Sequence, residues 1–347
     1  MARLPLLGAV LAGYSPARFA EPLELPGLVS HAPGDWRLFA AGLLAGCAAL
    51  APVLVMALRA RPAAPPPAGR FPRWGWLGVA LCAASWVLAW APIPGLEWLR
   101  ARSFTPLWCG YVVVVNAWVL ARSGDCLLRR PRALAGLAAL SAVFWWFFEY
   151  LNRFVESWRY EGVGVEGWGD LLAFGVLPFA TVLPAVVSTQ QLLATFPRFA
   201  SAFSGRAPWR PPAPRVLGAL LVVASAAGLM ALPLWPNVLF PLPWLAPLLL
   251  ITGLQASLGW PHVFTSAGRG DFQPLVTWAL AGLGCGFFWE MWNVASLARW
   301  TYVIPWVDQV RVFEMPLLGY FGYLAFGWEC AAVSALVRGE EGISIRP

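Results

Sequence analysis

Two stretches decide the fold: FFEYLNRFVESWRY at Phe147–Tyr160 and FFWEMWNVASLARWTY at Phe287–Tyr302. Each has aromatic residues before an E-x-x-N element and a W-x-Y element after it. The Glu and Asn of the first copy lie 141 positions before those of the second, and the Trp and Tyr lie 142 positions before. One pattern repeated at one offset, with a single inserted residue, predicts an internal duplication.

Composition places these stretches in a membrane. The chain has 347 residues, of which 59% are hydrophobic and 12% are charged, and its mean hydropathy is +0.65. Soluble domains carry roughly 25% charged residues, about twice this share. Apolar runs of about 20 residues, the length that crosses a bilayer core, recur along the chain. We therefore predict an all-α, polytopic helical membrane protein.

The apolar runs predict nine membrane-spanning helices. Their approximate ranges are 37–58, 74–92, 105–121, 133–152, 170–191, 216–235, 242–258, 272–293 and 315–337. Spans two to five and six to nine form two four-helix repeats, because FTPLWCGYVVVV and FPLPWLAPLLL open equivalent hairpins. Both repeats start on the same side of the membrane, so they are parallel and related by an axis along the membrane normal.

These spans divide the chain into five parts. An N-terminal segment, one additional helix and a Pro-rich loop occupy 1–73, and the two repeats occupy 74–191 and 216–337. A linker at 192–215 joins the repeats, and a tail follows at 338–347. The first 14 residues are too short and too weakly charged for a signal peptide.

Loop charge predicts the orientation. The loops at 59–73, 122–132, 192–215 and 257–271, with the tail, hold 15 Arg against four acids. The loops on the opposite side hold eight Arg and at least nine acids. The positive-inside rule puts the first set in the cytoplasm, with the N-terminus outside and the C-terminus inside. Arg without any Lys is typical of a GC-rich bacterial genome, so we expect the bacterial inner membrane.

The E-x-x-N elements predict a buried site near the outer ends of spans four and eight. Residues i and i+3 share a helix face, so Glu149 with Asn152 and Glu290 with Asn293 form two polar patches. A carboxylate at this depth should point into the bundle. We expect Glu149 and Glu290 to supply acid chemistry. The residues expected to bind the substrate are Asn152, Asn293, Trp145, Trp158, Tyr160, Trp289, Trp292, Trp300, Tyr302, Glu314 and Glu329.

Other interpretations of these residues stay open. The Glu and Asn side chains could form a hydrogen-bonded clamp between the two halves, or lie in water if the span boundaries are misplaced. Trp158, Trp300 and Tyr302 could belong to an aromatic belt at the membrane interface. Trp145 and Trp289 lie closer to the acids, which favours a ligand groove more strongly.

Several kinds of chemistry find no support in the sequence. The six Cys form no C-x-x-C pair and most lie in apolar runs, which is typical of small buried hydrophobes. Two His residues give no basis for a haem or a His-rich metal site. No Asp-rich motif for a diphosphate, GxSxG, HExxH or Walker loop is present. The net charge of +7 fits contact with lipid phosphates rather than nucleic acid. The sequence does not identify a cofactor.

The segment WTYVIPWVDQVRVFEMPLLGYFGYLAF, from Trp300 to Phe326, resembles the membrane-embedded lycopene-cyclase type of carotenoid protein. That family has duplicated helical units, with a W-x-Y element before a Pro–acid turn that opens the next helix. The resemblance extends more faintly to 158–178. Here Glu314 precedes Pro316, whereas the family acids follow the Pro. The resemblance implies a carotenoid-type substrate.

Three functions remain open from the sequence. The first is an enzyme or binding protein for a hydrophobic lipid or isoprenoid, in which a Glu donates a proton and Trp rings stabilise positive charge. The second is a proton- or ion-coupled transporter that uses the same acids as carriers. The third is a structural or assembly subunit. Membrane lipids are the expected partners, together with a hydrophobic small molecule.

Overall fold

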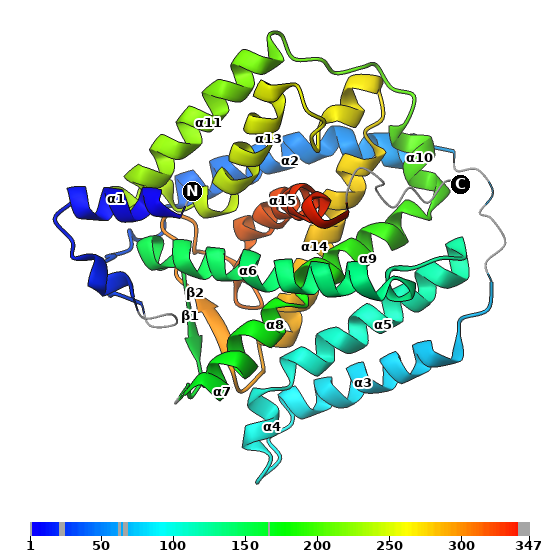
Figure 1. The fold of residues 1–347 in the computed structure, drawn as a ribbon, viewed down its shortest axis with the longest axis horizontal. Coiled ribbons are helices and arrows are strands. Elements are labelled where there is room, and N and C mark those ends of the chain that lie inside the picture. The colour runs from blue at the N-terminus through cyan, green and yellow to red at the C-terminus, as the bar shows by residue number, and fades with distance from the viewer. Residues whose placement is uncertain (1, 21–24, 62–63, 65–68, 166, 339–347) are drawn as a thin grey trace.

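The structure is a computed structural model that describes residues 2–20, 25–61, 64, 69–165 and 167–338. It is mostly helical (Figure 1), which agrees with the all-α prediction. Part of the Pro-rich loop and residues 339–347 of the predicted tail lie outside the described residues.

A continuous or broken helix lies at each of the nine predicted positions. They are α2 (Trp36–Arg59), α3 (Arg73–Trp90), α5 (Phe104–Ser123), α6 (Pro131–Val155), a broken run of α7 (Trp168–Leu171), the π-helix η3 (Leu172–Val176), α8 (Leu177–Phe179) and α9 (Val182–Ala194), then α11 (Pro214–Ala231), α13 (Ala246–Leu258), α14 (Gln273–Asn293) and α15 (Tyr320–Arg338). In the described part of the chain, six segments are long and apolar enough to cross a membrane: α2, α5, α6, Trp168–Ala194, α11 and Leu317–Val337. These six fit a membrane protein.

Several short elements lie between and before these helices. The helical ones are α1 (Arg3–Leu11), η1 (Pro16–Phe19), α4 (Glu97–Ala101), η2 (Leu127–Arg129), α10 (Pro197–Phe203), α12 (Pro236–Leu239), η4 (Leu242–Trp244), η5 (Thr265–Arg269) and η6 (Leu317–Gly319). The strands are β1 (Trp158–Glu161), β2 (Arg299–Tyr302), β3 (Arg311–Val312) and β4 (Met315–Pro316). The helix α1 had no counterpart among the predicted elements. It packs against α11, so closely that a Cβ at Gly8 would overlap the carbonyl of Met230.

Four helices, α6, α9, α14 and α15, form the centre of the molecule. The helix α9 contacts α6, α14 and α15, and α15 also contacts α6 and α14. The hairpin of α3 and α5 packs on α9 through α5, and the hairpin of α11 and α13 packs on α15 through α13. Figure 1 shows these two hairpins on opposite sides of the central helices. The helix α2 touches α10 and η6 and is the least buried long helix, with 6% of its apolar window covered.

Glycines let the backbones of packed helices approach closely. A Cβ on Gly218 would lie 2.5 Å from the carbonyl oxygen of Gly253, and one on Gly110 would lie 3.0 Å from that of Gly78. These contacts join α11 to α13 and α3 to α5. Gly282 meets Gly327 in the same way between α14 and α15. Small residues at crossings are how helices pack tightly in lipid, where burial of apolar surface gives little driving force.

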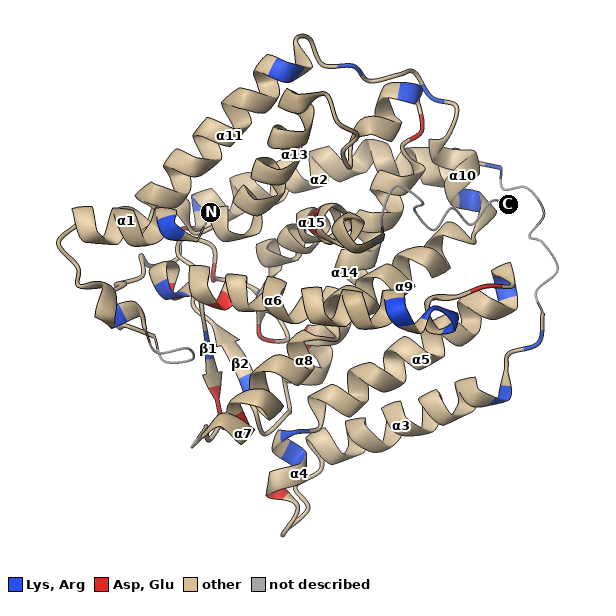
Figure 2. Ribbon diagram, in the orientation of Figure 1, with Lys and Arg blue, Asp and Glu red and all other residues tan. Residues whose placement is uncertain are grey.

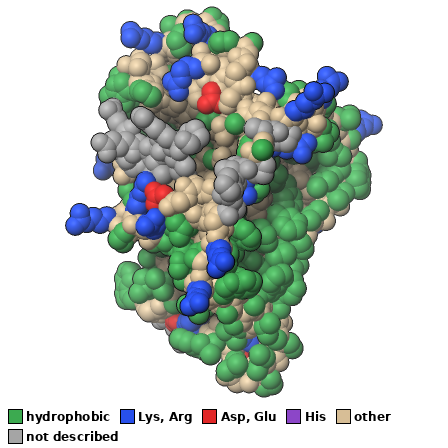
Figure 3. Space-filling view, turned by 90° about the vertical axis from the view of Figure 1, so that its right-hand side faces the viewer, with side chains coloured by type: hydrophobic (Ala, Val, Ile, Leu, Met, Phe, Trp, Pro, Cys, Tyr) green, Lys and Arg blue, Asp and Glu red, His purple; other side chains and the backbone are tan. Residues whose placement is uncertain are grey.

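The outer surface separates charge from apolar area. In Figure 2, many of the Arg residues lie along the upper and right margins, near α10 and the ends of α3 and α11 on that side, and others lie near α1, the ribbon and α4. Most acids lie at the lower left, around β1, β2, α7 and α4. Figure 3 shows broad hydrophobic areas beside the Arg side chains. Leu44, Leu54 and Leu58 of α2 are 71%, 58% and 64% exposed, which water would disfavour and lipid would accept.

Candidate ligand-binding site

The two W-x-Y elements form a two-stranded antiparallel ribbon. Trp158 pairs with Tyr302, and Tyr160 pairs with Trp300. Residues i and i+2 of a strand share a face, as do residues directly opposite each other, so all four aromatic side chains lie on one face. They point towards the bundle, because they line an internal pocket. The ribbon therefore brings together two segments about 140 positions apart in the chain.

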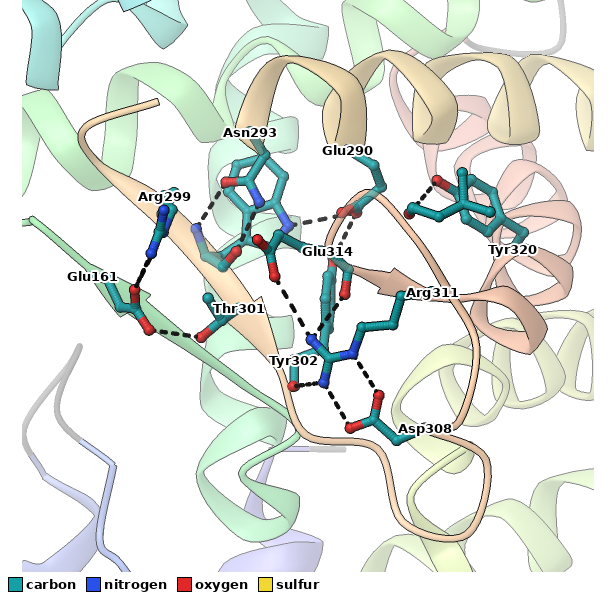
Figure 4. A network of polar contacts seen from close by, with 12 residues as sticks. Glu161, Glu290, Asn293, Arg299, Thr301, Tyr302, Asp308, Arg311, Glu314 and Tyr320 are labelled. Atoms are coloured by element: carbon teal, nitrogen blue, oxygen red, sulfur yellow. Dashed lines mark hydrogen bonds and ion pairs between the residues drawn. The ribbon is translucent and has the colours of Figure 1, made fainter. Parts of the chain in front are cut away.

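The opposite face of the ribbon carries charge. Arg299 forms an ion pair with Glu161 at 3.0 Å, and the hydroxyl of Thr301 donates to the same carboxylate at 3.2 Å (Figure 4). Both members of the ion pair are at least 40% exposed, so the pair contributes little to stability. The alternation of aromatic and charged residues along each strand thus sets an inner and an outer face.

Asn152 and Asn293 fix the position of each strand relative to the helix before it. The amide of Asn152 donates to the carbonyl of Trp158 at 2.7 Å, and its oxygen accepts from the backbone N–H of Ser157 at 2.8 Å. Asn293 donates to the carbonyl of Trp300 at 2.7 Å and accepts from its N–H at 2.8 Å. Both Asn residues are 1% exposed. Their bonds lie within each copy, between a helix and its own strand, rather than between the halves.

Glu149 accepts hydrogen bonds from three aromatic side chains. The hydroxyl of Tyr160 donates at 2.5 Å and the indole N–H of Trp145 at 2.9 Å, both to Oε1. The indole N–H of Trp158 lies 3.3 Å from both oxygens. The carboxyl is 5% exposed. Its depth is tolerable because every oxygen has a donor, and the donors are held in place by it in turn.

Glu290 also accepts hydrogen bonds from three aromatic side chains, but its third donor comes from a different helix. Tyr302 donates to Oε1 at 2.8 Å and Trp300 at 3.4 Å, as their equivalents do in the first copy. The position equivalent to Trp145 is Gly286, and the ring of Tyr323 from α15 occupies the space beside it. The hydroxyl of Tyr323 supplies the third bond, at 2.6 Å. A third donor is thus present in both copies, from the same helix in one and from a neighbouring helix in the other.

The two carboxyls also differ in the hydrogen bonding of their second oxygen atom. Both oxygens of Glu149 accept hydrogen bonds. The Oε2 atom of Glu290 is buried and has no hydrogen-bond partner among the described residues. The second copy therefore holds a carboxyl oxygen with spare hydrogen-bonding capacity.

An aromatic pocket of about 880 Å³, including open volume at its mouth, lies against this ribbon. Six predicted site residues line it: Trp145, Trp158, Tyr160, Trp289, Trp300 and Tyr302. Glu149, Asn152, Glu290 and Asn293 are not among the lining residues. The aromatic donors form the wall, and the carboxyls lie behind it. Acid groups in this position orient the wall and reach the pocket only through a tyrosine hydroxyl.

The remaining predicted residues lie elsewhere. Glu314 is in the outer loop, where Arg311 pairs with it and with Asp308 (Figure 4). Trp292 is buried against Trp108, and its backbone carbonyl accepts the indole N–H of Trp90. Glu329 is fully buried in α15, and neither of its oxygens has a hydrogen-bond partner in the described residues.

Several pocket residues were missed from the sequence. They are Phe104, Phe174, Phe179, Trp244 and Tyr323. Trp244 is the Trp of the Pro-Trp hairpin entry FPLPW, a pattern that identified the segment but not its role. Arg102 also lines the pocket, pairs with Asp170 and lies against the rings of Trp98 and Phe174 at 4.3 and 4.5 Å. These residues converge only through tertiary packing.

The ribbon tyrosines remain neutral donors over the usual pH range. Burial, followed by the nearby Glu149 carboxyl, raises the pKa of Tyr160 well above its ordinary value. Burial and then Glu290 raise the pKa of Tyr302 in the same direction. A neutral phenol keeps its proton and continues to donate to the carboxyl. The pocket wall thus presents ring faces, with its hydroxyls turned to the acids.

No group of three or more His, Cys, Asp or Glu residues gathers as a metal site in the described part of the chain. Comparison with known proteins gave no match to a family model, to a curated protein or to a solved structure. The functional argument therefore depends on the geometry of the aromatic pocket.

Proposed function

We propose that this chain is a multi-pass membrane protein that binds a hydrophobic, lipid- or isoprenoid-like molecule in the aromatic pocket. The observation that carries the proposal is a largely apolar pocket whose ring wall is held by two buried carboxyls. Ligand sites are typically concave, aromatic-rich and provided with few polar groups. The carboxyls fix the donors Tyr160 and Tyr323, so the wall is rigid before a ligand arrives.

Helix bounds support the proposed duplication. The helices α3 and α11 have 18 residues each, and Arg73 and Pro214 begin them 141 positions apart. Phe104 begins α5 and Ala246 begins α13, 142 positions later. The packing agrees, because α5 lies on α9 as α13 lies on α15. On this basis the molecule has two parallel four-helix repeats, nine crossings, and α2 as an additional helix.

The charge distribution supports the proposed orientation. The Arg-rich margin of Figure 2 belongs to the loops assigned to the cytoplasm, and the ribbon with its acids lies at the other end. The pocket would then lie towards the outer leaflet of a bacterial inner membrane. A ligand dissolved in that leaflet could reach it without crossing water.

Acid chemistry in this pocket is best assigned to Glu290. Its Oε2 atom has no hydrogen-bond partner among the described residues, whereas both oxygens of Glu149 are engaged. Its Oε1 contacts Tyr302 and Tyr323, both of which line the pocket. A proton could pass from the carboxyl to a bound alkene through one of these hydroxyls, while Trp faces stabilise the developing positive charge.

The binding proposal is tested by identifying the bound molecule. The protein is purified in detergent, extracted with organic solvent, and the extract is analysed by mass spectrometry. Ala173→Phe places a ring in the pocket, and Ala84→Phe makes the same change at an exposed position of α3. We expect a hydrophobic molecule to co-purify with the parent chain and the Ala84 variant and to be lost from the Ala173 variant. Equal retention in a folded Ala173 variant would contradict the proposal.

The acid step has its own test. Glu290→Gln keeps an oxygen that can accept from Tyr302 and Tyr323 but removes the ionisable group. Glu149→Gln is the matched control in the first copy. Reaction through Glu290 predicts an altered cellular lipid or pigment profile for the first variant alone. An unchanged profile for both correctly inserted variants rules out acid chemistry and leaves binding.

Transport is a second candidate, favoured by polar groups deeper in the bundle. Asn116 donates to Ser188 at 2.8 Å, and the Tyr111 hydroxyl lies 2.8 Å from the Thr189 hydroxyl. Glu329 of α15 is a further fully buried polar group in the bundle. Proton-dependent solute uptake by reconstituted vesicles, lost in Glu329→Gln, would establish this function instead.

A further inference from the structure

A second pocket lies on the other side of the aromatic wall. Its volume is about 1090 Å³, again including open space at the mouth. It shares four rings with the first pocket: Trp158, Trp244, Tyr302 and Tyr323. We refer to the two as the first and second pockets. One layer of aromatic side chains separates them.

The second pocket occupies the position equivalent to the first in the other half of the chain. Phe179 lines the first pocket and Phe321, 142 positions later, lines the second. Ala173 and Met315 stand in the same relation, also 142 positions apart. The two cavities are thus built from matching places in the two halves of the chain.

The two pockets differ in charge at one matching position. Arg102 lines the first pocket, and its counterpart 142 positions later is Trp244. None of the described residues that line the second pocket is charged. The hydroxyls of Tyr302 and Tyr323 in the second pocket are already bonded to Glu290, and the other polar side-chain groups of its lining are the indole N–H groups of Trp158 and Trp244. A ligand there meets ring faces and aliphatic groups.

These features define the chemistry of an occupant. A charged or strongly polar group would lose its hydrogen-bonding partners without finding new ones in the second pocket. A hydrocarbon chain has no such partners to lose and packs against the ring faces. Leu245 lies at the rim and is 36% exposed, so apolar surface continues from the pocket to the outside.

We propose that the second pocket is a separate binding site for an uncharged hydrocarbon chain. The inference rests on the proposed membrane-embedded binding function and adds a second site of narrower chemistry. The first pocket accepts a molecule with a polar end near Arg102, and the second accepts an apolar chain alone. Because the sites share four rings, each occupant contacts one face of the same wall.

Gly322 gives a sharp way to fill the second pocket. It lines this pocket, and a Cβ built on it meets no atom within 4 Å. Gly322→Leu therefore introduces a side chain into the cavity without a clash at its first atom. Gly284 on α14 is the matched control, because its Cβ also meets nothing within 4 Å and it lines neither pocket.

The experiment uses a straight-chain alkyl diazirine without a polar head, and maps its crosslinks in the purified full-length chain by peptide mass spectrometry. We expect labels within 240–245 or 315–325 in the parent chain and in Gly284→Leu. In Gly322→Leu these labels should fall about tenfold, because the leucine side chain fills part of the cavity and removes about 1.4 kcal/mol of binding free energy. Detergent-purified variants that elute as single symmetric peaks are compared, so that misfolding is not mistaken for loss of binding.

The outcomes separate this inference from the function proposed above. Absence of labels from both segments in a folded parent chain, or labels unaffected by Gly322→Leu, overturns the second site. Loss of the co-purifying molecule in Ala173→Phe depends on the first pocket and is measured independently. If that molecule is retained while Gly322→Leu abolishes the crosslinks, the first-pocket proposal fails and the second site stands.

Discussion

The hydroxyl of Tyr323 offers the most direct test of the site geometry. It donates to Glu290 Oε1 at 2.6 Å, and the tyrosine is 6% exposed. Tyr323→Phe removes that bond and leaves the ring in the wall. Loss of a hydrogen-bond donor to a buried carboxyl costs about 1–3 kcal/mol, so we expect a loss of about 2 kcal/mol in the free energy of unfolding.

Tyr320 on the same helix is the control. Its hydroxyl donates to the carbonyl of Val312 at 3.1 Å in an exposed position. Water can replace that bond, so Tyr320→Phe should cost less than about 1 kcal/mol.

Thermal unfolding of both variants in the same detergent gives the comparison. At about 2–4 °C per kcal/mol, Tyr323→Phe should lower Tm by about 4–8 °C and Tyr320→Phe by no more than about 4 °C. Equal shifts for the two variants would show that the carboxyl does not depend on its third donor. The account of the pocket wall would then be wrong.

Three further predictions follow from the same geometry. Gly286→Ala places a Cβ against the ring of Tyr323 and should lower the free energy of unfolding by about 1–3 kcal/mol. Gly284→Ala meets open space and should be neutral or stabilising by up to about 1 kcal/mol, and chemical or thermal unfolding distinguishes the two variants. Tyr160 and Tyr302 have raised pKa values in the folded chain, so their protonated phenols stabilise the fold below the ordinary phenol pKa of about 10, and this contribution is lost as pH rises through the folded values. Near-ultraviolet titration should therefore show these two phenols ionising only when the chain unfolds. The exposed ion pair of Arg299 should contribute less than about 1 kcal/mol, and a larger loss of stability in Arg299→Gln would contradict its placement on the outer face.

The sequence predicted the helices well because each long apolar run has one simple outcome in lipid. It also identified the two E-x-x-N elements and the W-x-Y elements as related, from their common offset. It did not predict the ribbon, because strands of four residues carry too little alternation to be recognised. The contribution of Tyr323 was equally hidden, since Gly286 gives no sign of which distant ring will fill its space.

The positions of the acids relative to the pocket depended on three-dimensional packing. Spacing along α6 places Glu149 on an inward face, and its burial agrees with that expectation. Whether it contacts a ligand depends on which rings lie in front of it, and those come from β1 and from one turn earlier on α6. The sequence also predicted that Glu314 binds the substrate. Its partner Arg311 lies three residues earlier, on β3, and Glu314 lines neither pocket.

The register of the ribbon bears on how the chain could evolve. Arg159 faces Thr301, which under the proposed duplication is its equivalent in the second half, 142 positions along. In an ancestral pair of identical halves, the same register would set one guanidinium directly against another, and like charges opposite each other weaken a strand pair. Covalent fusion removes the demand that each position be compatible with itself. A single gene could then encode Arg on one strand and Thr on the other. In the same way, the residues that line its two cavities could diverge.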